Sequence, residues 1–503
     1  MSRTPDKPTG SERIAHVGEA QIGRAVRVGG VWSVLQILLR NGISIGTTAI
    51  LARLLSADDY GLTGMVATLT AALMVFANMG LSWATIQRRD LTEAQVSNLF
   101  WLNVMIGFAL WAVAALLSPL VAGFYGRPEL VAIILVMGVS FAISGVAVQP
   151  VALMTRAMRF RALALIEVLT PVPGAVVAVA VAGAGGGYWA LVAMGIVTQL
   201  TRTLAVLFAS NWRPRRLARG VGTREMVVFG GLLAVNGVLI YVSRHFDSIL
   251  IGRVWGAEAL GYYDRAYFLM LLPSMLANGV LTNLMVPSLS AFQHDMDRFA
   301  RAYRRAVRLV AYFGMPMAVG LALTAAPAVR LVYGDGWMPV VPLLMWLSIA
   351  AVTQPVYNTT GWLFTASGQA RAYLWLTAVN TVVLGGVFLL TVPYGILVLA
   401  AGYGITMGLV IPLPALWYAH RVARIPLWAT LRTLAPVAGL NLGMALCVVG
   451  AKVGAERAGL SEGATFAAQV VTGVAVYAAL TPLVLREMFY GDVVAMLHLG
   501  KMG

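Results

Sequence analysis

Long apolar stretches recur along the whole chain, and they constrain its fold more than any other feature. A helix that crosses a bilayer needs about 20 apolar residues, and the 503 residues divide into about 14 such stretches with short polar connections. Hydrophobic residues make up 59% of the chain and charged residues 11%, with a mean hydropathy of +0.81. A water-soluble globular protein does not have this composition. We therefore predict an all-α integral membrane protein.

The ends of the predicted spans are defined to about four residues. The polar residues 1–27 contain no apolar core with a cleavage site, so we expect a cytoplasmic tail rather than a signal peptide. The spans themselves are 28–53, 60–86, 96–122, 129–155, 162–184, 187–210, 226–251, 260–292, 309–329, 338–366, 372–392, 395–419, 433–451 and 464–485.

The distribution of Lys and Arg predicts the orientation of these spans, because cationic segments stay on the cytoplasmic side of a membrane. The two tails and every second loop hold 26 of the 36 basic residues, whereas the alternate loops hold six. This bias also explains most of the net charge of +16 without any nucleic-acid partner. We expect a multi-pass membrane protein with both termini in the cytoplasm.

Two similar halves are indicated by an internal match at an offset of 200 residues. The stretch LARLLSADDYGLTG, from Leu51, aligns without a gap with IGRVWGAEALGYYD, from Ile251. Because six spans separate the two stretches, both repeats have the same orientation, which is the parallel arrangement of some transporters. The identical pairs in these stretches are Arg53 and Arg253, Ala57 and Ala257, and Gly61 and Gly261.

This repeat predicts the domain organisation. We expect two parallel six-helix bundles joined by a basic cytoplasmic linker, then two additional transmembrane helices and a second cytoplasmic tail. The predicted segments are the N-terminal tail at 1–27, the first bundle at 28–210, the linker at 211–225, the second bundle at 226–420, the two additional helices at 421–485 and the C-terminal tail at 486–503.

Arg40 lies about a dozen residues from each end of the first predicted span, near the middle of the bilayer. An arginine at this depth costs at least ~2.5 kcal/mol on insertion, and its side chain cannot easily reach either interface. We therefore expect Arg40 to face a wet cavity or a buried partner. One interpretation is an anion contact in a central lumen, and the other is a structural pair with Glu167 or with a backbone carbonyl.

Two more charges fall inside the predicted spans of the first half. Glu167 lies about one turn inside span five and is a candidate for proton or cation coupling, although its side chain could simply extend to the interface. Arg202 lies about two turns inside span six. It is a candidate for substrate binding with the same structural alternative.

Charges of both signs gather in SRHFDSILIGRVWGAEALGYYDRAYFLM, from Ser243 to Met270. Arg244 and Asp247 are three residues apart on one helical face, where an ion pair would lower the burial cost of each. His245 points about 100° away from that face and is a second candidate for coupling. Further along the stretch are the gating or ion-pair candidates Arg253, Asp264 and Arg265. The group forms either a latch at the outer mouth or part of a polar pathway.

Catalytic and cofactor motifs do not compete with a transport function. The chain has no P-loop, its five histidines are not paired at metal-ligand spacing, and its single Cys447 excludes an intrachain disulfide. The 20 acidic residues lie almost entirely in loops. We expect no enzyme activity, no metal and no cofactor.

Six stretches of the chain have the character of family motifs: ILARLLSADDYGLTGM, FANMGLSWATIQRRDLTEAQVSNLFWLN, FYGRPEL, NGVLIYVSRHFDSILIGRVWGAEALGYYDRAY, VPSLSAFQHD and YGDGWMPVVPLL. They resemble the bacterial polysaccharide exporters and lipid-linked oligosaccharide flippases related to the colanic-acid exporter. These flippases belong to a larger group with the multidrug and toxin extrusion transporters and the lipid II flippase. The resemblance covers about residues 28 to 420, with Ala57 and Tyr60 replacing the usual Pro and Phe of the first motif.

The resemblance implies a V-shaped fold of two bundles that moves an isoprenoid pyrophosphate-linked oligosaccharide by alternating access through a cationic cavity. The implied partners are membrane lipids, a polysaccharide polymerase and export machinery, without nucleic acid, and the implied location is the bacterial inner membrane. A cation-coupled multidrug exporter of the same fold is the alternative, but it favours deep acidic residues where this chain has Arg40. A membrane-embedded polymerase is a third hypothesis, disfavoured because the chain has no large outer loop.

We predict that reporter fusions will show the alternation of the loops directly. Fusions at Arg216 and Arg305 should report the cytoplasm, and fusions at Gly126 and Gly334 the outside, because basic loops are retained on the cytoplasmic side. Paired alkaline phosphatase and fluorescent protein fusions measure this. An outside signal at Arg305 would contradict the arrangement of two six-span halves.

Overall fold

The structure is a computed structural model that describes residues 19–78, 82, 85–86, 91–218, 245–292 and 295–484. Within these ranges the chain is helical and contains no β-strand. Arg244 lies outside the described residues. The prediction of an all-α membrane protein is confirmed for the part of the chain that the structure describes.

Eleven helical segments in the described ranges are long and apolar enough to cross a membrane, and each overlaps a predicted span. The remaining three predicted spans are matched in part, one by α2, which is Ala57–Asn78, and two by α10, which is Phe246–Ala291. Gly256 interrupts α10 with non-helical backbone angles (φ +82°, ψ −175°), between the predicted spans that end at 251 and begin at 260.

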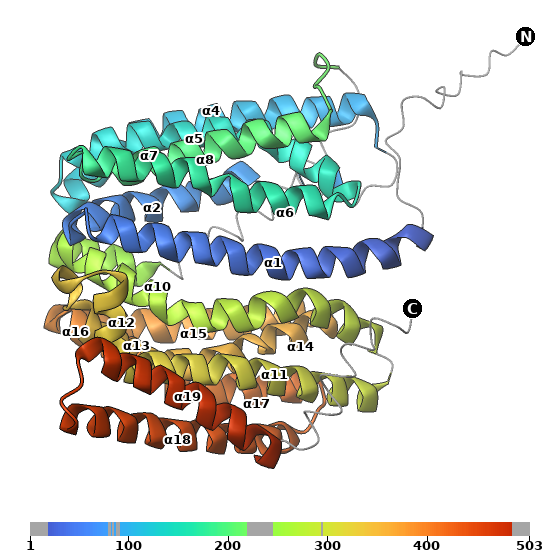
Figure 1. Ribbon diagram of the computed structural model, residues 1–503. Helices are drawn as coiled ribbons and strands as arrows, with labels where there is room; N and C mark the ends of the chain where they lie inside the picture. The colour runs from blue at the N-terminus through green and yellow to red at the C-terminus, as the bar shows by residue number, and fades with distance from the viewer. Residues whose placement is uncertain are drawn as a thin grey trace, which may run out of the picture. The chain divides into compact units, whose positions relative to one another are not determined.

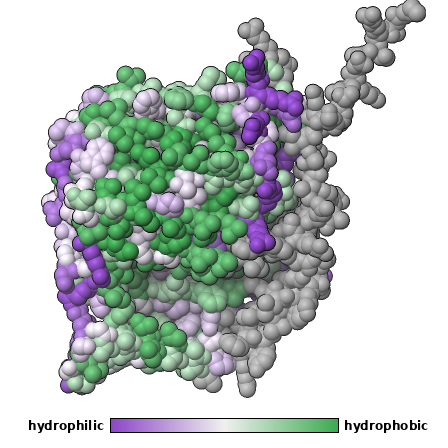
Figure 2. All heavy atoms as spheres, turned by 45° about the horizontal axis from the view of Figure 1, so that its top comes forward, coloured by the Kyte–Doolittle hydropathy of each residue, from purple (hydrophilic) through white to green (hydrophobic). Residues whose placement is uncertain are grey.

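The visible surface of the described residues carries the pattern that a bilayer requires. Figure 2 shows apolar side chains across the broad middle of one face, with hydrophilic side chains gathered along its two ends. Large apolar residues such as Leu116, Phe208 and Val382 are 74% or more exposed. This exposure is unfavourable in water but matches a surface that contacts lipid.

The described residues pack as two compact units, which Figure 1 shows as helical ribbons. The first unit contains residues up to 47 and residues 62–249, and the second contains 48–61 and residues from 250 onward. Residues 48–61, which contain the end of the first helix, the following turn and the start of α2, thus pack with the second unit.

Unit 1 is built mainly on two long helices, α4 and α5, which lie side by side, with α8 packed along α5 and α7 along α8. Its helices are α1 Glu19–Ala52, the part of α2 that follows residue 61, α4 Glu93–Tyr125, α5 Glu129–Arg156, α6 Phe160–Leu169, α7 Pro171–Gly183 and α8 Trp189–Ser210. The last five residues of α1 belong to unit 2.

In unit 2, α11 packs between α13 and α18, and α18 pairs with α19. Its core includes the fully buried rings of Tyr263, Tyr303 and Phe364. After α10 its elements are α11 Met296–Leu323, α12 Ala325–Val332, η1 Asp335–Trp337, α13 Val340–Asn358, α14 Thr360–Ala366, α15 Ala370–Thr391, η2 Val392–Tyr394, α16 Ile396–Ile405, η3 Thr406–Val410, α17 Pro412–Val422, α18 Leu427–Arg457 and α19 Glu462–Val484.

The basic linker predicted at 211–225 is described as far as residue 218, and this part is fastened to α4. The Asn98 side chain donates to the Ala218 carbonyl (2.6 Å) and accepts from the Ala218 amide (2.9 Å). Trp101 donates to the Arg215 carbonyl (2.9 Å), and Glu93 pairs with the Arg215 guanidinium. The start of the linker is therefore an ordered part of unit 1.

The repeat residues Gly61 and Gly261 form a close crossing of α2 and α10 within unit 2. A Cβ atom at Gly61 would overlap the carbonyl oxygen of Ala257, and one at Gly261 would overlap that of Ala57. Four of the six positions that match at the 200-residue offset thus pack against one another in reciprocal pairs, Gly61 on Ala257 and Gly261 on Ala57. Only glycine allows the backbones to approach this closely.

We predict that Gly61→Ala and Gly261→Ala each destabilise the protein by about 1–3 kcal/mol, because the added methyl overlaps backbone that cannot rotate away. Thermal unfolding in detergent, followed by fluorescence-detected size exclusion, measures the loss. Gly439→Ala in α18 is the matched control, since a Cβ there meets nothing within 4 Å. Wild-type stability of both crossing variants would contradict the close approach.

Candidate functional site

The deep charges of unit 1 meet on three helices. Arg40 lies within α1, Glu167 near the end of α6 and Arg202 within α8. The chain positions Glu167 through a break between α6 and α7, where Pro171 lacks an amide hydrogen. Next to this break the Ile166 carbonyl accepts from both the amide (3.0 Å) and the hydroxyl (2.8 Å) of Thr170.

Glu167 bridges the two arginines unequally. Its Oε1 accepts from Arg202 Nε at 2.7 Å, and its Oε2 lies 3.9 Å from Arg40 Nη1. The side chains of Glu167 and Arg202 are 25% and 29% exposed, whereas that of Arg40 is 59% exposed. The short contact is a charge-assisted hydrogen bond, and the long one is only electrostatic.

This cluster, Arg40 with Glu167 and Arg202, has a formal charge of +1. Each guanidinium has five N–H donors, and one carboxylate satisfies few of them. The structural pair considered for Arg40 is therefore present, yet most of its side chain remains accessible. The arrangement can hold an anion beside Arg40 while Glu167 keeps the two guanidinium groups from repelling each other.

The remaining candidates lie along α10. Asp247 is 3% exposed and its Oδ1 accepts from the Ser248 amide (2.8 Å), while His245 lies just before the helix and its carbonyl accepts from the Ile249 amide. Arg253 is exposed just before the break at Gly256, and Asp264 is half-buried. The Arg244 to Asp247 pair remains a prediction, because Arg244 is outside the described residues.

Arg265 packs its guanidinium over aromatic rings. The guanidinium carbon lies 4.6 Å from the centre of the Tyr60 ring and 5.8 Å from that of Phe268. Tyr60 in turn contacts Trp337 edge to face, with ring centres 5.3 Å apart. Cation–π contacts of this kind stabilise a partly desolvated arginine, so Arg265 helps to hold the start of α2 in unit 2.

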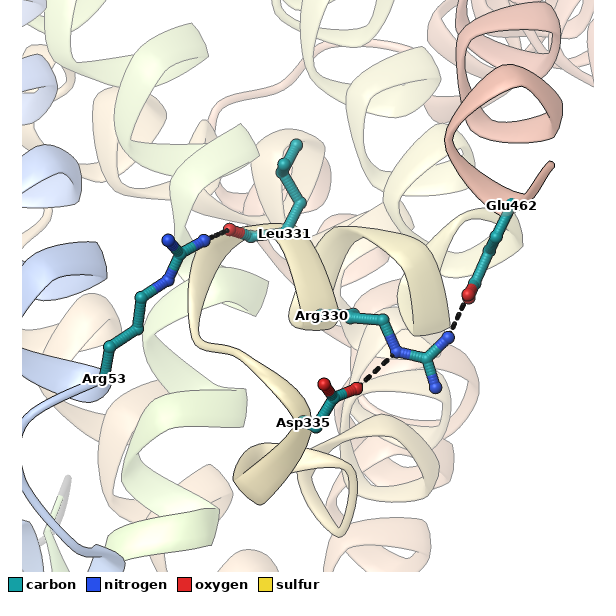
Figure 3. Close-up of polar contacts among 5 residues, drawn as sticks. All are labelled: Arg53, Arg330, Leu331, Asp335 and Glu462. Carbon is teal, nitrogen blue, oxygen red and sulfur yellow. Dashed lines mark hydrogen bonds and ion pairs between the residues drawn. The ribbon is translucent and has the colours of Figure 1, made fainter.

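A polar network links the ends of several helices in unit 2 (Figure 3). It was not predicted from the sequence. Arg330 Nε donates to Asp335 Oδ1 (2.7 Å), and its Nη1 pairs with Glu462 at the start of α19. Arg53 Nη2 donates to the Leu331 carbonyl (2.9 Å) at the end of α12. The hydrogen bond and charge of Glu462 raise the pKa of Arg330 above its ordinary value. Glu462 lies 132 residues from Arg330, so no local pattern indicates this contact.

Beside this network, unit 2 contains a cavity of about 480 Å³. Its walls come from the ends of α1 and α2, from α10 and from the turn that contains η1. Neither the cavity nor the role of Trp337, which donates its indole N–H to the Ala52 carbonyl (2.7 Å), was predicted from the sequence.

Comparison with known proteins identifies the family. The family model described as "Polysaccharide biosynthesis protein" matches residues 50–342, which is more than half of the chain. The chain belongs to this family. Among its relatives, the teichuronic acid biosynthesis protein TuaB of Bacillus subtilis is 26% identical over 358 residues, covering 70% of this chain and 74% of TuaB. The lipopolysaccharide biosynthesis protein WzxC of Escherichia coli is 23% identical over 68% of this chain and 70% of WzxC.

Solved structures agree on the fold. An inward closed conformation of the lipid II flippase MurJ matches with a TM-score of 0.71 at 14% identity, covering 93% of this chain and 99% of MurJ. An inward-facing multidrug resistance MATE transporter matches with a TM-score of 0.63 at 14% identity, covering 80% of this chain and 99% of that one. The chain therefore has the fold of these transporters, and the predictions of the family and of a transporter rather than an enzyme are confirmed.

We predict that Glu167 and Arg202 stabilise the protein as a pair. Glu167→Gln and Arg202→Gln should each lower the free energy of unfolding by about 1–3 kcal/mol, because each leaves a partly buried charge without its partner. The double variant should lose less than the sum of the two. Thermal unfolding in detergent measures this cycle.

The matched control is Glu456→Gln on α18, whose partner Lys452 is 3.9 Å away and whose side chain is 57% exposed. An exposed pair of this kind contributes little. Additive losses for Glu167 and Arg202 would show that their contact has no energetic consequence.

Proposed function

We propose that this protein moves an isoprenoid pyrophosphate-linked oligosaccharide from the inner to the outer leaflet of the bacterial inner membrane, for surface polysaccharide biosynthesis. The family supports this, as do the names of relatives in teichuronic acid, lipopolysaccharide and succinoglycan biosynthesis. The observation that carries the substrate class is the accessible guanidinium of Arg40 in a cluster with a formal charge of +1.

A pyrophosphate presents several anionic oxygens, and guanidinium groups bind such oxygens through paired hydrogen bonds. Arg40 retains this capacity because its contact with Glu167 is long, at 3.9 Å. Arg202, held by Glu167 at 2.7 Å, contributes charge from a fixed position. We infer that Arg40 contacts the pyrophosphate directly and that Glu167 positions both arginines.

The same geometry argues against the export of cationic drugs through this cluster. A carboxylate that attracts a cation must be accessible and must not be neutralised by its neighbours. Glu167 is 25% exposed and has two arginines beside it, so a cation here would meet net positive charge. The net positive charge around Glu167 thus favours an anionic ligand over a cationic one.

The orientation and partners of the protein belong to the same proposal. We infer a location in the inner membrane with both termini cytoplasmic, from the excess of basic residues in alternate loops. The two predicted bundles, 28–210 and 226–420, would alternate access, with the helices at 421–485 added to the second. A polymerase that consumes the product on the outer side is the expected functional partner.

We predict that Arg40→Gln lowers polysaccharide export about ten- to a hundredfold, since a hydrogen bond to a charged group contributes about 1.5–3 kcal/mol. Arg40→Lys should lower it less, because the charge remains while the paired donors are lost. The measurement is surface polysaccharide in a strain that lacks the native gene, normalised to the amount of transporter in the membrane.

Arg371→Gln is the matched control, because Arg371 is exposed at the start of α15. Accumulation of lipid-linked oligosaccharide on the inner leaflet in Arg40→Gln would place the block at translocation. Wild-type export by Arg40→Gln would leave Arg40 as a structural residue and remove the anion site.

A further inference from the structure

The cavity of unit 2 has no role in the function proposed above. Its volume of about 480 Å³ falls within the range of about 300–1,000 Å³ typical of small-molecule sites. All of its lining residues belong to unit 2, so the cavity is complete within one compact body.

Three of the stretches that carry the family resemblance meet at this cavity. LLSADDYG contributes Asp58, GAEALGYYD contributes Glu258 and Tyr262, and YGDGW contributes Asp335 and Trp337. These stretches are far apart in the sequence and come from both repeats. Their convergence on one hollow gives them a common structural role.

The walls offer hydrogen-bond acceptors and donors together. The acceptors are the carboxylates of Asp58, Glu258 and Asp335, and the main charged donor is the guanidinium of Arg53. Glu258 Oε1 accepts from the Tyr262 hydroxyl at 3.2 Å, and Arg53 gives one Nη2 donor to the Leu331 carbonyl. A carboxylate accepts several hydrogen bonds and a guanidinium donates five. Glu258 can therefore accept further hydrogen bonds from a ligand, and Arg53 can donate further ones.

Aromatic rings form another part of the wall. Trp337 and Tyr333 are 3% and 1% exposed, and their ring centres lie 5.6 Å apart, so they make a rigid backing. Tyr262 is only partly buried and meets Trp337 edge to face at 5.8 Å. Its ring is thereby held in place at the cavity, where an apolar ligand surface can pack against it.

We propose that this cavity binds a sugar ring of the oligosaccharide, in addition to the anion site near Arg40. A sugar hydroxyl both donates and accepts, which suits walls that mix carboxylates with a guanidinium, and the C–H face of the ring suits an aromatic side chain. This inference rests on the proposed function for the identity of the ligand. On the predicted topology, with the turn at Gly334 outside, the site receives the sugar on the outer side.

The charge of the walls argues against other ligands. Three carboxylates against one guanidinium repel a phosphate or pyrophosphate group. A metal ion needs carboxylates that converge on it, yet Asp335 is engaged by Arg330 and is 84% exposed. Within the described residues no group of acidic, histidine or cysteine side chains has the arrangement of a metal site. A neutral polyhydroxylated ligand fits both observations.

The test uses a thiol placed at the cavity. Gly336 lines it, and a Cβ there meets nothing within 4 Å, so Gly336→Cys should fold. Cys447, which is exposed, is first replaced by alanine. The full-length protein in detergent is alkylated with a maleimide in the presence of oligosaccharides released by mild acid from the surface polysaccharide of the source strain.

We expect these oligosaccharides to slow alkylation at Gly336→Cys, by about tenfold at ten times the half-protecting concentration. Alkylation at Gly463→Cys, an exposed position in α19 where a Cβ also meets nothing within 4 Å, should not change. Adding Glu258→Gln should raise the half-protecting concentration about tenfold, because it weakens a charge-assisted hydrogen bond, whereas Glu456→Gln should not.

In the alkylation assay, three outcomes overturn the proposal. These are no protection at any soluble concentration, equal slowing at both cysteines, and protection by calcium chloride or tetramethylammonium but not by oligosaccharide, which would mean a cation site. Calorimetric titration of the wild-type protein and of Glu258→Gln with the same oligosaccharides gives a second readout if the cysteine variant does not fold. Absence of binding heat with the wild type also overturns it.

The export assay separates this inference from the proposed function. If the wild-type gene restores surface polysaccharide but the cavity is not protected, the sugar site is wrong and the flippase function stands. If the gene does not restore polysaccharide, the proposed function fails, whatever the cavity binds.

Discussion

Hydrocarbon offers no hydrogen-bond partners to a peptide group, and the whole described structure follows from this constraint. The chain meets it with helices, and hydrogen bonds within the chain are kept where the helices depart from regular α geometry. At the junction of α6 and α7 the amide and the hydroxyl of Thr170 both donate to the Ile166 carbonyl. In the π-helical turn of Thr406–Val410 the Ile411 amide reaches the Thr406 carbonyl at 2.9 Å. Irregular backbone is therefore possible where a site needs it, and Glu167 lies beside such a break.

The sequence predicted most of the fold because the helical signal in membranes is strong and local. Span ends at 129–155, 187–210 and 372–392 agree with α5, α8 and α15 to within two residues. The prediction was poorest for α11, expected from residue 309 but beginning at Met296, because its first turns carry arginines and are amphipathic rather than uniformly apolar. A hydropathy pattern detects the part of a helix that faces lipid. It does not detect the polar turns by which the helix extends beyond the membrane.

Sites were harder to predict than spans, since a site depends on contacts between distant residues. Depth alone indicated that Arg40 needs a partner, and Glu167 was one of the alternatives. The stronger pair of Glu167 with Arg202 depends on how α6 and α8 pack, which no spacing reveals. Likewise, the 200-residue offset aligned Gly61 with Gly261, but it could not show that each packs on the alanine of the other repeat. Equivalence in a repeat and contact in space are independent facts, and only the second explains why both glycines are needed.

The two candidate sites differ in charge, and this difference suits the proposed substrate, which has an anionic pyrophosphate and a chain of sugars. The cluster in unit 1 has a formal charge of +1, whereas the lining of the cavity in unit 2 has an excess of carboxylates. A pyrophosphate is attracted by the first and repelled by the second, while a neutral sugar can hydrogen-bond in both. A transporter must also release what it binds, so several moderate sites serve it better than one tight site. On the proposals above, the excess negative charge beside the sugar site prevents the pyrophosphate from binding there. The substrate is then held on that side only by the weaker contacts of its sugars, so it can dissociate.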